Sequence, residues 1–188
     1  MIKKFFLLFD TLFQPKPKKK KVLILGYGRG GKDTLAEYLR DKYGYKFSSS
    51  SLYAAKKFIY KTIKDHLGYN SFEECYNDRH KWRDLWYNLI TIYNHKDKSR
   101  LASEMLNDGY DMYVGMRNID ELKACIDKGI FDVIIWVDGA ERTGFIEPES
   151  SCTVRAEQTD MFNIIIDNNG SLAEFYHSID QLVKEGYL

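Results

Sequence analysis

The sequence predicts an α/β protein, a three-layer α/β/α sandwich built on a mostly parallel sheet. A unit of short apolar strand, loop and amphipathic helix recurs along the 188-residue chain, as is typical of such sheets. Apolar residues make up 44% and aromatic residues 15% of the chain, enough to pack the core of one domain. The clearest unit spans residues 22–39, where four apolar residues lead through a glycine-rich loop into a helix. We therefore predict one domain over residues 22–188, preceded by a short extension.

The overall charge and the cysteines exclude several classes of protein. The net charge is +1, so the chain as a whole offers no electrostatic argument for binding nucleic acid. The three cysteines, Cys75, Cys125 and Cys152, are far apart and match no metal-binding spacing. An odd number of scattered cysteines fits a reducing compartment, so we expect a cytoplasmic protein.

The extension, residues 1–21, is apolar and then basic. The apolar run of residues 1–13 is broken by Asp10, is too short to span a bilayer and lacks a signal-peptide cleavage site. One interpretation is a short helix that packs on the domain, followed by a basic linker. Another is an anchor at a membrane surface, with Lys18–Lys21 near anionic headgroups. A contact of these lysines with nucleic acid is a further alternative.

The first unit reads VLILGYGRGGKDTLAEYL and contains a phosphate-binding loop. Gly26, Gly31 and Lys32 match the pattern G-x-x-x-x-G-K. Glycines let consecutive N–H groups point at one anion, and the following helix adds the positive end of its dipole. We therefore predict that Gly26, Gly28, Gly30, Gly31 and Lys32 bind the phosphates of a nucleotide, with Lys32 reaching the β- and γ-phosphates.

The same glycines also fit the dinucleotide pattern G-x-G-x-x-G, which is the main rival. That pattern needs an acidic residue about 20 residues further on to bind a ribose. Residues 45–51, YKFSSSS, hold no carboxylate, and the dinucleotide pattern gives Lys32 no role. A glycine-rich turn without a ligand is a third interpretation, although so many glycines cost backbone entropy. The pattern with the lysine is therefore favoured.

The residue after the lysine departs from the usual pattern. Most phosphate-binding loops have Ser or Thr there, whose hydroxyl contacts magnesium. Here the position is Asp33, and Thr34 follows, so either Asp33, through water, or Thr34 could bind the metal. Asp138 is a third candidate, because it ends the apolar strand predicted over residues 131–138. A simple turn with Gly139 is the alternative for Asp138.

Polar residues elsewhere form a second group of candidates, for binding a substrate. Ser49 follows a short predicted strand, at the end of the sheet where ligands bind, and Lys56 lies in the first turns of the helix predicted over residues 52–67. Arg79 and Arg83 are four residues apart, so they share one face of a helix and could clamp a phosphate. A capped polar loop, a surface lysine and a solvated charged face are the alternatives.

The later units complete the sheet. Trp82 and Trp86 are four residues apart, which predicts that they share a core-facing side of one helix. Ser171 and Glu174 form a capping box that begins the last helix. The further predicted elements are strands over residues 45–47, 110–115 and 161–166, and helices over residues 33–43, within 71–107, over 119–128 and from 171 to about 185.

Three stretches resemble one family of enzymes. They are GKDT at residues 31–34, SSSLYAAKKF at residues 49–58 and IIIDNNGSLAEF at residues 164–175. Over most of residues 22–186 the chain resembles the bacteriophage deoxynucleoside monophosphate kinases, P-loop kinases related to the adenylate and dephospho-CoA kinases. The resemblance implies a P-loop NTPase fold of the nucleoside monophosphate kinase type and a role in deoxynucleotide metabolism.

The resemblance also implies roles for particular residues. The turn that contains Asn168 would lie beside the nucleotide base, and residues 139–160 would form a lid that supplies Arg142. Arg117 matches an arginine that follows a strand in the family. Lys32, Arg117 and Arg142 would then neutralise the oxygens of the transferring phosphoryl group.

We therefore predict an ATP- and magnesium-dependent kinase that phosphorylates a deoxynucleoside monophosphate in the cytoplasm, or in the host cytoplasm if a phage encodes it. Two alternatives stay open. A kinase acting on a hydroxymethylated base in DNA would suit the basic residues 16–21. A non-catalytic nucleotide-binding module would account for Asp33 and for Gly115, where the family has an aspartate. The sequence predicts neither the accepted base nor the oligomeric state.

Overall fold

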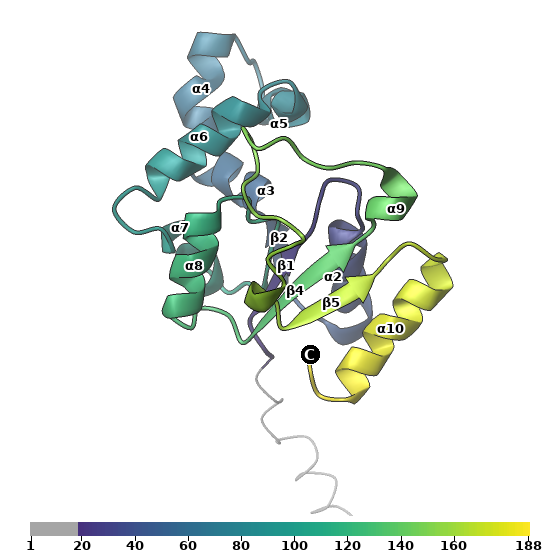
Figure 1. Cartoon of the computed structure of the whole chain (residues 1–188). Helices are drawn as coiled ribbons and strands as arrows, with labels where there is room; N and C mark the ends of the chain where they lie inside the picture. The colour runs from purple at the N-terminus through teal and green to yellow at the C-terminus, as the bar shows by residue number, and fades with distance from the viewer. Residues whose placement is uncertain (1–18) are drawn as a thin grey trace, which may run out of the picture.

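Five parallel strands form one sheet at the centre of the molecule (Figure 1). The computed structural model describes residues 19–188. The spatial order of the strands is β2-β3-β1-β4-β5, so β1 lies in the middle and all carboxyl ends meet at one edge. This confirms the predicted α/β class. The strands are β1 (Val22–Leu25), β2 (Phe47–Ser49), β3 (Met112–Val114), β4 (Val133–Asp138) and β5 (Ile164–Asp167).

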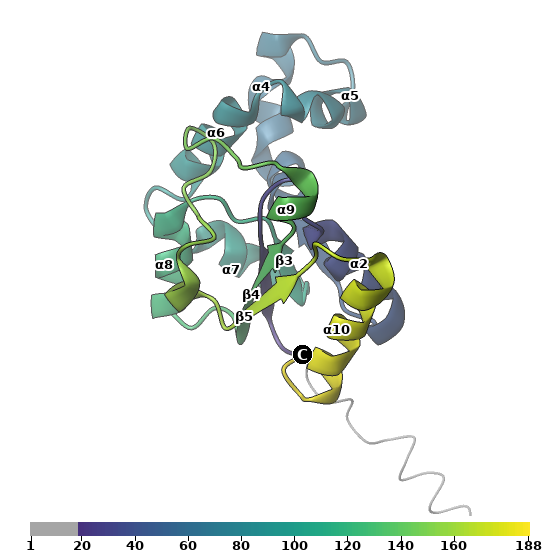
Figure 2. The same cartoon turned by 45° about the vertical axis from the view of Figure 1, so that its right-hand side comes forward.

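Helices cover both faces of the sheet and extend beyond its carboxyl edge. In Figures 1 and 2, α2 and α10 lie on one side of the sheet and α7 and α8 on the other, while α4, α5 and α6 project above it. A π-helical turn, Ala55–Ile59, joins α3 to α4. The helices are α2 (Lys32–Tyr43), α3 (Ser50–Ala54), α4 (Tyr60–Leu67), α5 (Phe72–Asn77), α6 (Arg83–Tyr93), α7 (Arg100–Asn107), α8 (Ile119–Asp127), α9 (Ala140–Thr143) and α10 (Leu172–Lys184).

Alternate residues of the strands form two apolar cores, one on each face. On one face, Ile24 belongs to a cluster that includes Leu35 of α2 and Phe175 of α10. On the other, Leu23 belongs to a cluster that includes Leu122 of α8. All four aliphatic residues of β1 are completely buried, as expected of a parallel sheet covered on both sides. The rigid middle of the sheet therefore anchors the loop that follows β1.

Several element boundaries differ from those expected. β2 lies two residues later than predicted, and a 3₁₀ turn, Thr159–Met161, precedes β5. Trp82 is 40% exposed whereas Trp86 is buried, because α6 begins only after Trp82, which is its N-cap residue. The two tryptophans therefore do not share a buried face. The capping box of Ser171 and Glu174 at the start of α10 is confirmed.

The basic end of the predicted extension contacts the domain. Residues 1–18 lie outside the described residues, and with them the apolar run. Lys19 Nζ donates to the carbonyl of Gly44 after α2, and Lys20 Nζ donates to the carbonyls of Gly186 (2.5 Å) and Tyr187 (3.2 Å) after α10. Lysines favour such sites because helix ends expose carbonyls. Between residues 19 and 188 no helix is long and apolar enough to cross a membrane.

Candidate active site

The loop between β1 and α2 has the backbone that a phosphate-binding loop needs. Gly26 and Gly31 have φ angles of +139° and +109°, and Arg29 has a φ of +64°. A Cβ atom on Gly26 would lie 2.5 Å from the carbonyl oxygen of Val137 in β4, so only glycine fits there. Successive turns of this kind point N–H groups at one place, and the start of α2 adds a partial positive charge. The backbone conformation of the loop is therefore the one predicted from its glycines.

Lys32 begins α2 and extends over this loop. Its Nζ donates a hydrogen bond to the carbonyl oxygen of Tyr27 at 2.6 Å. Burial lowers the pKa of Lys32 to about 8; the nearby carboxylates of Glu147 and Asp33 raise the pKa, and Arg117 lowers it. The ammonium group thus stands in a site where it is poorly solvated, and an incoming phosphate would stabilise its charge.

Asn168 and Arg142 hold the loop from its outer side. Asn168 Nδ2 donates to the carbonyl of Gly30 at 2.8 Å, and its backbone N–H donates to Asp138. Arg142 Nε donates to the carbonyl of Asn168 at 2.9 Å, and Nη2 donates to the carbonyl of Arg29 at 3.1 Å. Asn168 is buried, Arg142 is exposed, and neither lines the cavity described next. In this structure both residues brace the loop.

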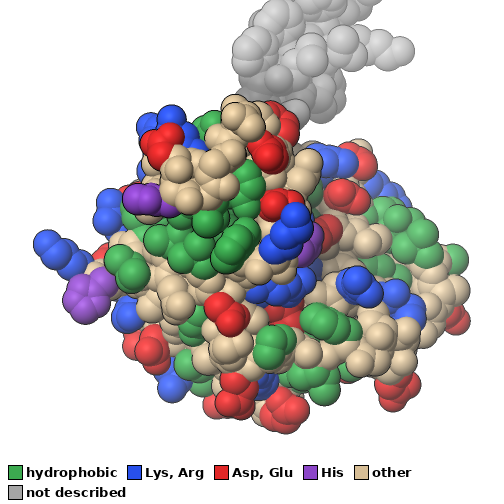
Figure 3. Space-filling model, turned by 90° about the horizontal axis from the view of Figure 1, so that it is seen from above, with side chains coloured by type: hydrophobic (Ala, Val, Ile, Leu, Met, Phe, Trp, Pro, Cys, Tyr) green, Lys and Arg blue, Asp and Glu red, His purple; other side chains and the backbone are tan. Residues whose placement is uncertain are grey.

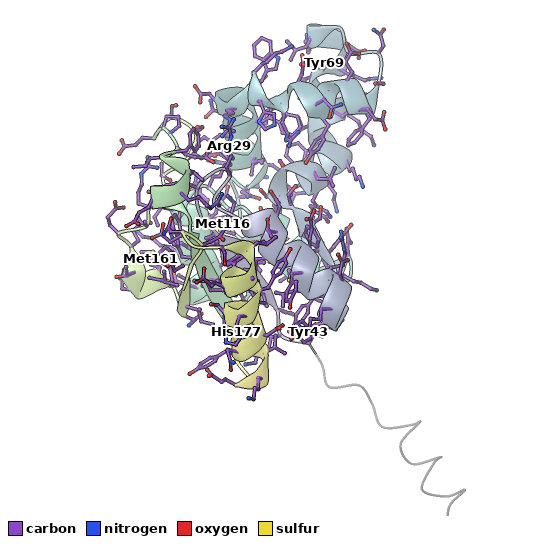
Figure 4. The ribbon with its side chains drawn as sticks, turned by 90° about the vertical axis from the view of Figure 1, so that its right-hand side faces the viewer. Arg29, Tyr43, Tyr69, Met116, Met161 and His177 are labelled. Carbon is purple, nitrogen blue, oxygen red and sulfur yellow. The ribbon has the colours of Figure 1, made fainter. Side chains whose placement is uncertain are left out.

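A cavity of about 790 Å³ opens at the carboxyl edge of the sheet. Figure 3 looks onto this end of the molecule and has Lys and Arg side chains near its middle, next to hydrophobic ones. Arg29 and Met116, labelled in Figure 4, both line the cavity and lie between the sheet and the upper helices. Among the residues predicted from the sequence, the cavity brings together Gly28, Lys32, Asp33, Ser49, Arg79, Arg83 and Arg117.

A buried carboxylate, which the sequence did not point out, lies among the cations of this cavity. Glu147 is 3% exposed, and its Oε2 accepts from Arg83 Nη1 at 3.2 Å and from Arg117 Nη1. Arg155, the other cation of the predicted lid, donates to the Glu147 carbonyl at 2.9 Å. A Cβ atom on Gly28 would lie 3.1 Å from Glu147 Oε1, so this carboxylate lies over the phosphate-binding loop. The predicted lid is thus folded onto the site.

Other predicted site residues lie outside the cavity or have local roles. Lys56 is exposed on the π-helical turn, and Thr34 is partly buried in α2; neither lines the cavity. Asp138 Oδ1 accepts from the backbone N–H of Ala140 at 3.0 Å and so closes a local turn just before α9. Ser49 lines the cavity, but its hydroxyl also caps α3. Within residues 19–188, no three His, Cys, Asp or Glu side chains cluster closely enough to hold a metal ion.

The walls of the cavity are rich in aromatic side chains that sequence reasoning assigned to the core or left aside. Tyr76, Trp86, Tyr87 and Tyr113 all contribute, together with Glu121 of α8. Glu121 had a signal in the sequence: it lies four residues before the buried Cys125, so the helical period puts an acid on the apolar face. The arginine cluster and this aromatic region belong to one cavity.

Comparisons with known proteins give a likeness of fold. No family model and no curated protein matches the sequence. Among solved structures, TT1252 from Thermus thermophilus is 17% identical over 90% of this chain and 99% of that chain, with a TM-score of 0.49. The shikimate kinase from Bacteroides thetaiotaomicron is 11% identical over 91% and 100%, with a TM-score of 0.49. The dephospho-CoA kinase from Campylobacter jejuni is 14% identical over 88% and 97%, with a TM-score of 0.47.

Proposed function

We propose that this protein is a phosphotransferase that moves the γ-phosphoryl group of ATP to a deoxynucleoside monophosphate. One observation carries the proposal: the phosphate-binding loop with Lys32 opens into the same cavity as Arg79, Arg83 and Arg117. A loop of this kind binds the phosphates of one ligand, and guanidinium groups bind the phosphate of another. Two phosphorylated ligands in one cavity are what phosphoryl transfer between nucleotides requires.

The donor side fits ATP with magnesium. The N–H groups of residues 26–31 would bind the phosphates, with Lys32 against the outer ones. Because the described residues hold no cluster of metal ligands, magnesium would be bound mainly through phosphate oxygens. Asp33, which lines the cavity, is then better situated to assist than Thr34 or Asp138. ATP and magnesium together supply the phosphoryl group and part of the charge neutralisation.

The acceptor side fits a nucleotide. Arg79, Arg83 and Arg117 would hold its phosphate, while the aromatic side chains of Tyr87 and Tyr113 offer flat apolar surface to a planar ring. A nucleotide base has a flat aromatic face that can pack against such walls, whereas a small polyol has none. This combination favours a nucleoside monophosphate over a small polyol as the acceptor.

Catalysis would rest on positioning and charge, since phosphoryl transfer leaves the protein little covalent chemistry. Lys32 and Arg117, which line the same cavity, would neutralise the transferring oxygens. Arg142 would act indirectly, because it ties Arg29 of the loop to the turn after β5. Glu147 would release Arg83 and Arg117 when the acceptor phosphate replaces its carboxylate.

An acceptor screen tests the proposal. Purified protein with ATP and magnesium would be offered each natural and 5-substituted deoxynucleoside monophosphate, and duplex DNA that carries 5-hydroxymethyluracil. We expect ATP consumption with at least one monophosphate and none with DNA. Turnover with the modified DNA alone would establish the DNA-kinase alternative instead. Tight ATP binding without turnover on any acceptor would favour the non-catalytic module.

A further inference from the structure

Two buried polar atoms lack a hydrogen-bond partner within residues 19–188. They are Nε1 of Trp86 and Oε1 of Glu121. Trp86 is 5% exposed and Glu121 is 2% exposed, and both line the cavity proposed for the acceptor. Buried polar atoms are nearly always paired, so each exception calls for a physical explanation. Here the two exceptions, a donor and an acceptor, occur in the same cavity.

The neighbouring polar groups of the cavity are paired, so these two atoms do not reflect generally loose packing. Asn118 Nδ2 donates to Thr91 Oγ1 at 3.3 Å, and Asn118 Oδ1 accepts from the backbone N–H of Asp120 at 2.9 Å. Ser50 Oγ donates to the carbonyl of Gly115 at 2.8 Å. Both residues line the cavity, so a ligand bound there is the nearest source of partners for these two atoms.

The burial of the Glu121 carboxyl group costs free energy, and the packing of α8 does not require an acid there. Burial raises the pKa of Glu121 to about 7, and its neighbours Asn94 and Lys98 oppose this shift only in part. Its residue neighbour Leu122 and the next turn's Cys125 are buried apolar residues, so an apolar side chain would suit the same face of α8. Burying a carboxyl group at this position costs free energy, and a ligand that hydrogen-bonds to the group would offset that cost.

We infer that Trp86 and Glu121 read the base of the acceptor nucleotide. The indole N–H of Trp86 donates to an oxygen or ring nitrogen of the base, and Oε1 of Glu121 accepts from a base N–H. The Watson–Crick edge of each base presents donors and acceptors in an order that differs between bases, so one fixed donor and one fixed acceptor favour some bases over others. The tyrosines of the same cavity cover the faces of the ring. The inference rests on the proposed function and adds the groups that select the acceptor.

Equilibrium binding without ATP tests the inference. Titration calorimetry would measure the dissociation constants of the nucleoside monophosphates for the wild type, Glu121→Gln, Glu121→Leu and Trp86→Phe. Matched controls are Glu73→Gln and Trp82→Phe, two exposed residues that do not line the cavity. For the preferred monophosphate we expect Glu121→Leu and Trp86→Phe to bind about tenfold to a hundredfold more weakly, as befits a lost buried hydrogen bond. Glu121→Gln should lose less affinity, because its amide oxygen still accepts. Each control should bind as the wild type does. The order of preference among bases should also change in the cavity variants.

A second readout separates recognition from a structural role. In urea unfolding, Glu121→Gln should keep or raise the midpoint, because it removes a buried charge that its neighbours compensate only in part. A lowered midpoint with unchanged binding and unchanged base preference would overturn the inference and make Glu121 structural. If Glu121 variants fail to fold, Trp86→Phe decides by the same binding criterion. A wild type that binds no monophosphate would overturn the proposed function, and this inference with it, whereas wild-type binding that neither residue affects overturns the inference alone.

Discussion

Lys32 and Glu147 place opposite charges over one phosphate-binding loop. The amine has a lowered pKa because it is buried, and the carboxylate is held by Arg83 and Arg117. The cations of the cavity exceed its buried carboxylates in number, so the site remains attractive to an anion with more than one negative charge. Three predictions follow from this balance of single charges.

Replacing Lys32 should abolish phosphoryl transfer while the fold remains. Lys32→Met keeps the length of the side chain but removes the charge that faces the transferring oxygens, so kcat should fall by at least about a hundredfold. Steady-state kinetics would measure this, with circular dichroism to establish folding. Lys61→Met, on the exposed face of α4, is the control that should retain full activity. Equal activity of the two variants would remove Lys32 from the mechanism.

The affinity for ATP should depend on pH through Lys32. Its pKa is about 8 rather than 10.5, so the amine is charged below pH 8 and neutral above it. Among the charged groups that face it, Glu147 and Asp33 favour the ammonium form and Arg117 opposes it. The dissociation constant for ATP should therefore rise as the pH increases through about 8, by up to about tenfold per pH unit. Calorimetry from about pH 6.5 to 9.5 would measure this dissociation constant. In the control Lys32→Arg, whose side chain stays charged, the dissociation constant should not change with pH. A wild-type dissociation constant that is also independent of pH would refute the role of Lys32 in ATP binding.

Removing the charge of Glu147 should tighten binding of the acceptor. Glu147→Gln leaves Arg83 and Arg117 without a carboxylate partner, so the acceptor phosphate no longer has to displace one. We expect the dissociation constant of the preferred monophosphate to fall by about fivefold, since the two arginines are about one-third exposed and partly screened. Glu149→Gln, on the same loop but 90% exposed, is the control. Weaker binding by Glu147→Gln would mean that the carboxylate instead holds the arginines in their binding positions.

At the scale of elements, the phosphate-binding loop depends on the turn after β5. Asn168 links the two, because its side-chain amide donates to Gly30 and its backbone pairs with the end of β4. The loop is therefore held by β4 and β5 as well as by its own glycines. The resemblance to known kinases predicted that the turn after β5 lies beside the nucleotide base. The contact of this turn with the loop between β1 and α2 was not predicted and is seen only in the structure.

Truncating Asn168 should loosen the loop. Asn168→Ala removes one buried hydrogen bond and leaves the Gly30 carbonyl unpaired, so the free energy of unfolding should fall by about 1–2 kcal/mol. The KM for ATP should rise while the KM for the acceptor stays the same, because the acceptor groups lie on other elements. Urea unfolding and steady-state kinetics would measure both effects, with Asn107→Ala, exposed at the end of α7, as the control. An equal rise in both KM values would contradict the assignment of Asn168 to the donor side.

At the scale of the whole molecule, the sequence predicted what is local and missed what is distant. The glycine-rich loop, the helix after it and the capping box of α10 follow from neighbouring residues, and each was predicted. Glu147 was not, because its partners Arg83 and Arg117 are 64 and 30 residues away in the chain. The cavity likewise joins the loop after β1 to β3, α6 and α8, which the strand order β2-β3-β1-β4-β5 brings together.

The predicted lid, residues 139–160, likewise combines a local feature that the sequence predicted with distant contacts that it did not predict. Its irregular composition over residues 139–160 was visible in the sequence, but α9 and the buried position of Glu147 were not. Arg142 was expected to face the transferring phosphoryl group from the lid; instead it lies outside the cavity, where its guanidinium binds the carbonyls of Arg29 and Asn168. Position along the chain alone does not determine on which side of a loop an arginine lies.

The transfer of a labelled phosphoryl group tests the central claim most directly. The protein would be incubated with ATP labelled at the γ-phosphate, magnesium and a mixture of deoxynucleoside monophosphates, and the labelled products would be separated and identified. The account predicts that the label appears in a deoxynucleoside diphosphate, and that Lys32→Met forms none. Label found only in inorganic phosphate, or remaining in ATP, would contradict the claim that the loop and the arginine cluster form one phosphotransferase site.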